Sequence, residues 1–243
     1  MRYRKAPILE AVLEFRWSSS KSLEELRIAL SSSAFEDFEE PKSRNQLDTT
    51  VKLDGSAYSH EKRQIGFEAT LRDGLQIVFL EEQKFIFVQR APYDRWEYFS
   101  ERALALLAPT VEALGIEEFS RVGLRFVNRI DIPEQKIDTD DYVTVRFDGP
   151  RQDRGAIEEL QMRVVKPSEK EGLHYALILA TTKSPWPDYS SILLDIDVFT
   201  REPIPAKGEK LMHVLGEMRR EKNEIFEECV TDRARDLFGG VEE

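Results

Sequence analysis

The chain has 243 residues, of which 41% are hydrophobic and 10% aromatic, a composition typical of folded globular proteins rather than disordered ones. Its 46 acidic residues outnumber its 35 basic ones, and the net charge of −11 disfavours nucleic acid and anionic lipid as partners. The single cysteine, Cys229, excludes an intramolecular disulfide and a cysteine-based zinc cluster, and no apolar window is long enough to span a membrane, so we expect a cytoplasmic protein.

The first part of the chain has the pattern of a strand, a short helix, an antiparallel meander and a long helix. Residues 7–17 alternate as a half-buried strand, and Ser22 with Glu25 fits a capping box at the start of the short helix. The dipeptides Asp54-Gly55 and Asp73-Gly74 predict turns of the meander. Its strands are expected at 47–53, 64–71, 75–80 and 84–89. Apolar residues then recur at helical spacing from Trp96 to Leu114, and Gly115 is a plausible stop.

The segment 121–132 near the middle of the chain is predicted to be a central strand with two different faces. One face carries Val122, Leu124, Phe126, Asn128 and Ile130, while the other is charged. Further strands are expected at 142–147, 156–165, 174–182 and 192–199. A second long helix follows, with a broad apolar face formed by Leu211, Val214, Leu215, Met218, Ile225, Phe226 and Cys229.

The order of elements in residues 1–116 recurs in residues 117–243. The sequence therefore predicts an α+β protein of two pseudo-repeated halves, each an antiparallel β-meander packed against a long C-terminal helix. Whether the two halves join into one continuous sheet or pack side by side is left open by the pattern.

Three short motifs carry a resemblance to a known family. They are the opening Pro7-Ile8-Leu9-Glu10-Ala11, the central Leu124-Arg125-Phe126-Val127-Asn128-Arg129-Ile130 and the closing segment from Phe226 to Thr231. In this order they resemble a sporadically distributed family of uncharacterised bacterial proteins of about this length, in which Phe126 is often tyrosine. The scattered distribution of that family implies an association with mobile or defence-related genes and supplies no activity.

The charged faces of the two opening strands are the main candidate for a polar site. Glu10 and Glu14 on the first strand are expected to face Arg125 and Arg129 on the second, with Asp195 and Asp197 extending the ladder on a later strand. The arginines could fork onto an anionic ligand, or the whole set could be a structural network of ion pairs. The structural network is the favoured reading.

Two polar groups lie on otherwise apolar faces. A buried Asn128 needs hydrogen-bond partners for its whole amide and is expected to anchor an irregular neighbour such as a bulge, with ligand binding as the alternative. Cys229 is expected to be a small core residue, because no neighbouring base can be identified that would activate its thiol.

The sequence contains no glycine-rich phosphate loop, no nucleophile elbow and no histidine metal motif. Asp195 and Asp197 share one strand face, but one strand supplies too few ligands for a divalent cation without others from elsewhere. We therefore expect no metal site and no cofactor.

The segment from Lys183 to Tyr189 is a loop in which prolines bracket aromatic residues. Trp186 and Tyr189 belong to the residue types enriched at interface hot spots, so the loop is a candidate partner-binding surface. The alternative is that Trp186 folds back onto the core. The mixed-charge segment from Met218 to Glu224 is interpreted as a solvent-exposed helix face.

These patterns favour a non-enzymatic component that binds, senses or neutralises something within a bacterial multi-protein system, such as a defence or toxin–antitoxin locus. Its expected partner is another protein or a second copy of the chain. The alternative is a protein that binds a small anionic ligand, or an enzyme, with its polar site on the sheet face around Arg125 and Arg129.

Overall fold

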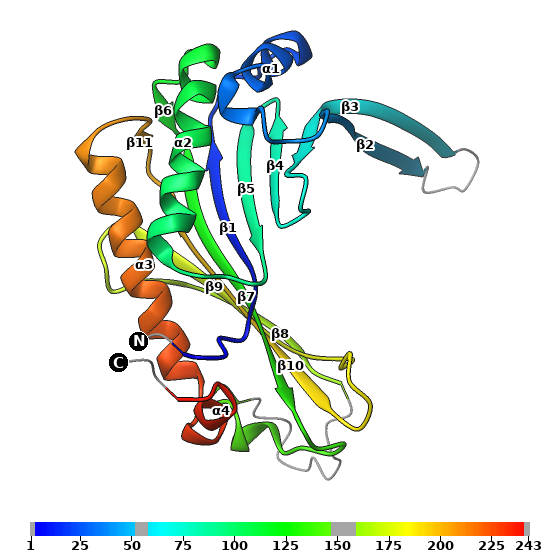
Figure 1. The fold of residues 1–243 in the computed structure, drawn as a ribbon, viewed down its shortest axis with the longest axis vertical. Helices are drawn as coiled ribbons and strands as arrows, with labels where there is room; N and C mark the ends of the chain where they lie inside the picture. The colour runs from blue at the N-terminus through cyan, green and yellow to red at the C-terminus, as the bar shows by residue number, and fades with distance from the viewer. Residues whose placement is uncertain (1–2, 52–57, 147–158, 241–243) are drawn as a thin grey trace.

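The computed structural model describes residues 3–51, 58–146 and 159–240 and is built on one large antiparallel sheet. Nine strands lie in the order β2-β3-β4-β5-β1-β7-β10-β9-β8 (Figure 1). Their bounds are β1 (Ile8–Arg16), β2 (Lys42–Val51), β3 (Tyr58–Thr70), β4 (Gln76–Glu81), β5 (Lys84–Arg90), β7 (Arg121–Ile132), β8 (Gln161–Pro167), β9 (Leu173–Thr182) and β10 (Ser190–Thr200). A separate pair consists of β6 (Glu118–Phe119) and β11 (Ile204–Pro205).

The two central strands, β1 and β7, have one apolar and one charged face because their sequences alternate with period two. Leu13 and Phe15 of β1 are fully buried, as are Val122 and Leu124 of β7. Leu13 pairs with Leu124 and Phe15 with Val122 across the strand boundary, so the apolar faces coincide. The core of the protein lies against this face of the sheet.

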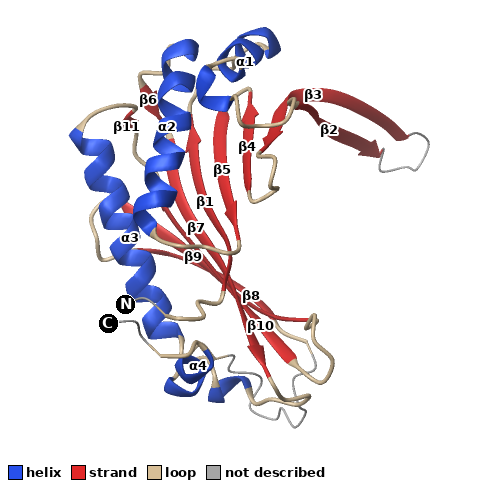
Figure 2. Cartoon of the chain, viewed as in Figure 1, coloured by secondary structure: helices blue, strands red, loops and turns tan. Residues whose placement is uncertain are grey.

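Two long helices, α2 (Trp96–Leu114) and α3 (Glu209–Cys229), cover the apolar face side by side (Figure 2). Gly115 ends α2 in the left-handed conformation, with φ of 60°, where a side chain would be strained. The shorter elements are α1 (Leu23–Leu30), η1 (Ser33–Phe35), η2 (Thr139–Asp141) and α4 (Asp232–Leu237). None of the helices in the described part of the chain is long and apolar enough to cross a membrane.

The chain begins and ends close together. The backbone N–H groups of Arg4 and Lys5 donate hydrogen bonds to the carbonyl oxygens of Gly240 and Phe238, at 3.2 and 2.9 Å. Tyr3 packs its ring against Phe238, with centroids 5.2 Å apart. These contacts fix the N-terminal segment beside α4 and the end of α3, where residues 3–8 line a cavity.

The α+β class, the antiparallel meander and both long helices confirm the sequence-based expectations. Ser22 forms the expected capping box with Glu25, and the turn around Gly74 joins β3 to β4. The strand expected at 142–147 is wrong over its described part, where Val143 makes only an isolated bridge with Val230. The carbonyl oxygens around Tyr142 instead accept hydrogen bonds from Thr231, which ties this segment to α4 rather than to the sheet.

The expected turn at Asp54-Gly55 lies outside the described residues. So do the end of the strand expected at 47–53, the end of that at 142–147 and the start of that at 156–165. The two expected halves share a sheet, because β1 from residues 1–116 pairs directly with β7 from residues 117–243. The sheet thus crosses the predicted boundary without interruption.

Candidate functional site

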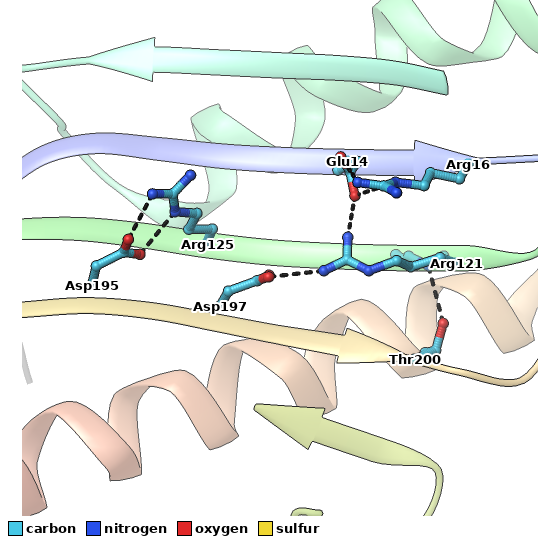
Figure 3. Close-up of polar contacts among 8 residues, drawn as sticks. Glu14, Arg16, Arg121, Arg125, Asp195, Asp197 and Thr200 are labelled. Atoms are coloured by element: carbon cyan, nitrogen blue, oxygen red, sulfur yellow. Dashed lines mark hydrogen bonds and ion pairs between the residues drawn. The ribbon is translucent and has the colours of Figure 1, made fainter. Parts of the chain in front are cut away.

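The charged face of the central strands carries a chain of ion pairs (Figure 3). Glu14 on β1 accepts hydrogen bonds from Arg16 at 2.8 and 2.9 Å and also from Arg121 on β7. Arg121 in turn donates to Asp197 on β10 at 2.8 Å. Gly123 makes room for this arrangement, because a Cβ at that position would lie 2.5 Å from a guanidinium nitrogen of Arg121.

A second, bidentate pair joins Arg125 to Asp195. The Nε and Nη2 groups of Arg125 donate to the two carboxylate oxygens at 2.8 and 2.6 Å. These hydrogen bonds raise the pKa of Arg125 above its ordinary value. Asp195 is only 2% exposed, so its carboxylate depends on this guanidinium for its main ionic contact.

The remaining charges of the predicted ladder also have partners. Arg129 donates to Asp131 on its own strand at 2.9 Å, and Asp131 accepts a further hydrogen bond from Ser191. Glu10 lies 3.8 Å from Arg90. The ladder is therefore an array of mutually paired side chains, and the guanidinium groups of its arginines already donate hydrogen bonds to protein carboxylates.

Burial raises the pKa of Asp197 above its ordinary range, and the nearby Arg121 offsets only part of that effect. Removing the carboxylate from water thus costs more than the ion pair returns. This balance is typical of a structural contact and leaves little driving force for exchanging a protein carboxylate for a ligand anion.

Asn128 does not join this ladder, because it lies on the opposite, helix-covered face. Its Nδ2 group donates to the carbonyl oxygens of Leu194 at 3.0 Å and Phe126 at 3.4 Å. The residue is 2% exposed and pairs with Ile8, directly beside the bulge where the β1–β7 register shifts. The amide thus lies at the irregular point of the central strand pair, and it also lines a cavity.

This cavity has a volume of about 650 Å³. Its walls come from three parts of the chain that are distant in sequence: the N-terminal segment 3–8, the segment 91–97 that leads into α2, and residues 219–227 of α3. Phe126 and Asn128 of β7 complete the lining. The volume falls within the range of known small-molecule sites.

Aromatic rings form one wall of the cavity. The Tyr93 ring lies 5.3 Å from that of Phe126 in an edge-to-face arrangement, and Trp96 packs 6.0 Å from Phe99 behind them. Burial raises the pKa of Tyr93 well above its ordinary value, so its hydroxyl stays protonated and able to donate. This wall offers a flat apolar surface with a hydrogen-bond donor at its edge.

The carboxylates that line the cavity have cationic or hydrogen-bonding partners within the protein. Glu97 accepts a hydrogen bond from Arg219 at 3.0 Å, and Glu224 pairs with Lys170. Glu227 accepts hydrogen bonds from the Tyr3 hydroxyl at 2.8 Å and from Arg235. Burial and the contact with Glu227 together raise the pKa of Tyr3 to about 12. Asp94 is contacted by Arg95 at 3.5 Å.

Lys222 differs from these groups. Its Nζ lies 4.0 Å from the centroid of the Phe126 ring, and among the described residues the amine has no hydrogen-bond or ion-pair partner. Burial, followed by the nearby positive charge of Arg219, lowers the pKa of Lys222 to about 8, and Glu227 opposes the shift only weakly. Among the described residues, the cavity therefore contains a cation with no carboxylate in hydrogen-bond or ion-pair contact.

The sequence alone places Lys222 on the apolar face of α3. The apolar face of α3 includes Leu215, Met218, Ile225 and Cys229, and Lys222 occupies the position between Met218 and Ile225 at the same helical spacing. A lysine in an apolar stripe is less common than one on a solvent-exposed face. The prediction that the segment from Met218 to Glu224 is a solvent-exposed face is therefore wrong for Lys222, and also for Met218 and Glu221, which are buried.

The proline-bracketed loop between β9 and β10 is exposed. Trp186 has 59% of its surface accessible and Tyr189 has 41%, so Trp186 does not fold back onto the core. The loop is fixed by a hydrogen bond from Gln135 to Asp188, which has a positive φ of 65°. It lies far in sequence from every segment that lines the cavity.

Metal and thiol chemistry receive no geometric support in the described part of the chain. No three histidine, cysteine, aspartate or glutamate side chains there gather as a metal-ion site would require. Burial raises the pKa of Cys229 to about 11, which keeps its thiol protonated at neutral pH.

Among known proteins, no family model matches the chain, and no curated protein matches its sequence.

Proposed function

We propose that this protein is a receptor for a small anionic molecule with an apolar, flat body, bound in the cavity between the N-terminal segment, α2 and α3. The observation that carries the proposal is Lys222, a buried amine without an anionic partner among the described residues. A buried cation is costly unless it is paired, and a bound anion would supply the missing charge.

The surroundings of Lys222 support the chemical class of this ligand. The aromatic wall favours a ring or another flat apolar group, which stacks on Phe126, Tyr93 and Trp96 and displaces water from them. The lining carboxylates are engaged by Arg219, Lys170, Tyr3 and Arg235, so they do not compete strongly for the amine. This arrangement favours a carboxylate, sulfonate or phosphate placed next to the aromatic wall.

Binding of the fluorescent probe anilinonaphthalene sulfonate tests the proposal, because the probe combines an anionic group with flat rings. One probe should bind per chain, and Lys222→Met should weaken its affinity at least about tenfold through loss of one charged contact. Lys210→Met changes an exposed lysine of the same helix that does not line the cavity, and it should have little effect. Equal affinities of the wild type and Lys222→Met would exclude this site.

We propose protein binding as a second role, which would make the receptor a sensing component of a larger system. The observation that favours it is the exposure of Trp186 and Tyr189 on one loop, since Trp and Tyr are enriched among the residues that contribute most to protein–protein binding. A pull-down from the host with wild type and with a Trp186→Ala/Tyr189→Ala variant tests it. Identical partner sets for the two proteins would refute the loop as a contact surface.

We infer further that residues 1–116 and 117–243 are a pseudo-repeat within this receptor. In the first half β1 is followed outward in the sheet by β5, β4, β3 and β2, and in the second β7 is followed by β10, β9 and β8. After these strands each half has a long helix, α2 in the first and α3 in the second, although the short helix α4 follows α3. Ancestral sequence reconstruction tests the inference, because identity between the halves should rise toward the root, and constant identity would contradict a duplication.

A further inference from the structure

Lys222 is a largely buried amine among the described residues that line the cavity. Lys222 projects from the middle of α3 and faces the Phe126 ring at 4.0 Å. An aromatic face stabilises the ammonium form only modestly and accepts no proton in a hydrogen bond. Since the described residues provide no carboxylate or carbonyl partner, the nitrogen is not occupied by a protein contact.

We propose that Lys222 captures aldehyde or ketone ligands covalently as an imine inside the cavity. This inference rests on the proposed ligand-binding function and narrows its ligand class to anionic, flat carbonyl compounds. When the carbonyl carbon bonds to Lys222, the anionic group lies toward the other cations that line the cavity, Arg4, Lys5 and Arg219. It adds a chemical step that simple charge recognition does not require.

The step is balanced by the ligand and the amine alone. The neutral Nζ attacks the carbonyl carbon, a C–N bond forms, and one proton passes from the nitrogen to the carbonyl oxygen to give a carbinolamine. The nitrogen then loses its one remaining proton to the departing hydroxyl group, which leaves as water, so the products are an imine and one water molecule. No oxidant, reductant or metal is consumed.

Two features of the site favour imine formation: the lowered pKa of the amine and a hydrogen-bond donor for the carbinolamine oxygen. Burial and the positive charge of Arg219 lower the pKa of Lys222 to about 8, so a sizeable fraction is unprotonated near neutral pH. The Tyr93 hydroxyl lines the same cavity and can donate a hydrogen bond to a developing carbinolamine oxygen.

Trapping with para-carboxybenzaldehyde and cyanoborohydride tests the proposal on the full chain. The probe has an aromatic ring, a carboxylate and an aldehyde, and reduction of its imine leaves a stable adduct. Mass spectrometry should find one adduct per chain, on the peptide that contains Lys222. Labelling at this position should be at least about tenfold faster than at the exposed Lys5, because more of the amine is unprotonated.

Two variants serve as controls. Lys222→Arg keeps the positive charge of the site but cannot form an imine, so it should abolish the specific adduct. Lys210→Met removes an exposed amine of the same helix that does not line the cavity, and it should leave labelling of Lys222 unchanged.

The matched alcohol para-(hydroxymethyl)benzoate separates covalent capture from binding, since it has no carbonyl group. The alcohol should bind to the wild type, as followed by shifts of the Trp96 indole N–H signal in NMR spectra, and should protect Lys222 from the aldehyde. If the alcohol binds while the aldehyde leaves Lys222 unmodified, imine formation is refuted and the ligand site stands. If neither compound binds, both the imine and the proposed ligand class are refuted.

Discussion

Replacing Lys222 with methionine should stabilise the protein at neutral pH. The pKa of this amine is about 8 in the folded protein against an ordinary value of 10.5, chiefly because of burial. The interval between the two values corresponds to about 3 kcal/mol of free energy by which folding disfavours the charged form. Part of the Lys222 side chain still contacts solvent, so this figure is an upper bound.

The attraction between the ammonium group and the Phe126 ring opposes this cost by roughly 1 kcal/mol. Methionine has a similar length and can keep the apolar contact with Phe126. We therefore expect Lys222→Met to raise the free energy of unfolding by about 2 kcal/mol at pH values below the folded pKa.

The sign of the pH dependence follows from the lowered pKa. Below about pH 8 both the folded and the unfolded chain carry the proton, and the folded state bears the full cost. Between about pH 8 and 10.5 the unfolded chain binds the proton and the folded chain does not, so the wild type gains stability as the pH rises. The difference between the wild type and Lys222→Met should shrink over this interval.

Urea denaturation at a series of pH values measures this difference. Lys210→Met, which changes an exposed lysine of the same helix, is the matched control and should show no such trend. A Lys222→Met protein that is less stable than the wild type at neutral pH would refute the reasoning. A difference that does not change with pH would refute it equally.

Three further substitutions test the structural account. Arg125→Ala should lower the free energy of unfolding by roughly 2 kcal/mol, because Asp195 stays buried without the guanidinium that pairs with it. Binding of anilinonaphthalene sulfonate should stay unchanged. A loss of binding with intact stability would show that the ladder is a ligand site. Gly123→Ala should cost up to about 1 kcal/mol in urea denaturation, because its Cβ displaces only the end of the Arg121 side chain and weakens its ion pairs with Glu14 and Asp197, and a gain in stability would contradict that packing. Ser22→Ala should cost about 1 kcal/mol in thermal unfolding through loss of the helix cap, and an unchanged melting temperature would show that the capping box does not hold α1.

Local patterns predicted the elements of the fold well, because they depend on neighbouring residues. The two faces of β7 follow from a period-two alternation, and the ends of α1 and α2 follow from Ser22 and Gly115. The strand expected at 142–147 failed because the same apolar alternation around Val143 packs against the end of α3 instead of joining a sheet.

The candidate site was less accessible to sequence analysis, because its walls come from three distant segments. Asn128 was noticed as a polar residue on an apolar face, and it lines the cavity as well as bonding Leu194. Lys222 was missed because the charged residues around it in sequence suggested a solvent-exposed face. Local spacing in the sequence does not indicate that the Phe126 ring faces the Lys222 amine. Nor does it indicate that Tyr3 and Arg235 donate hydrogen bonds to Glu227.

The most direct test of the account is the pKa of the Lys222 amine with and without a bound anion. Carbon-13 labelling at the lysine ε position, with Lys222→Arg for assignment, allows this titration by NMR. The account predicts a pKa of about 8 in the free protein and a clear rise when para-(hydroxymethyl)benzoate is bound, because an anion stabilises the charged amine. An ordinary lysine pKa in the free protein, or a lowered value that does not move on saturation with the anion, would contradict it.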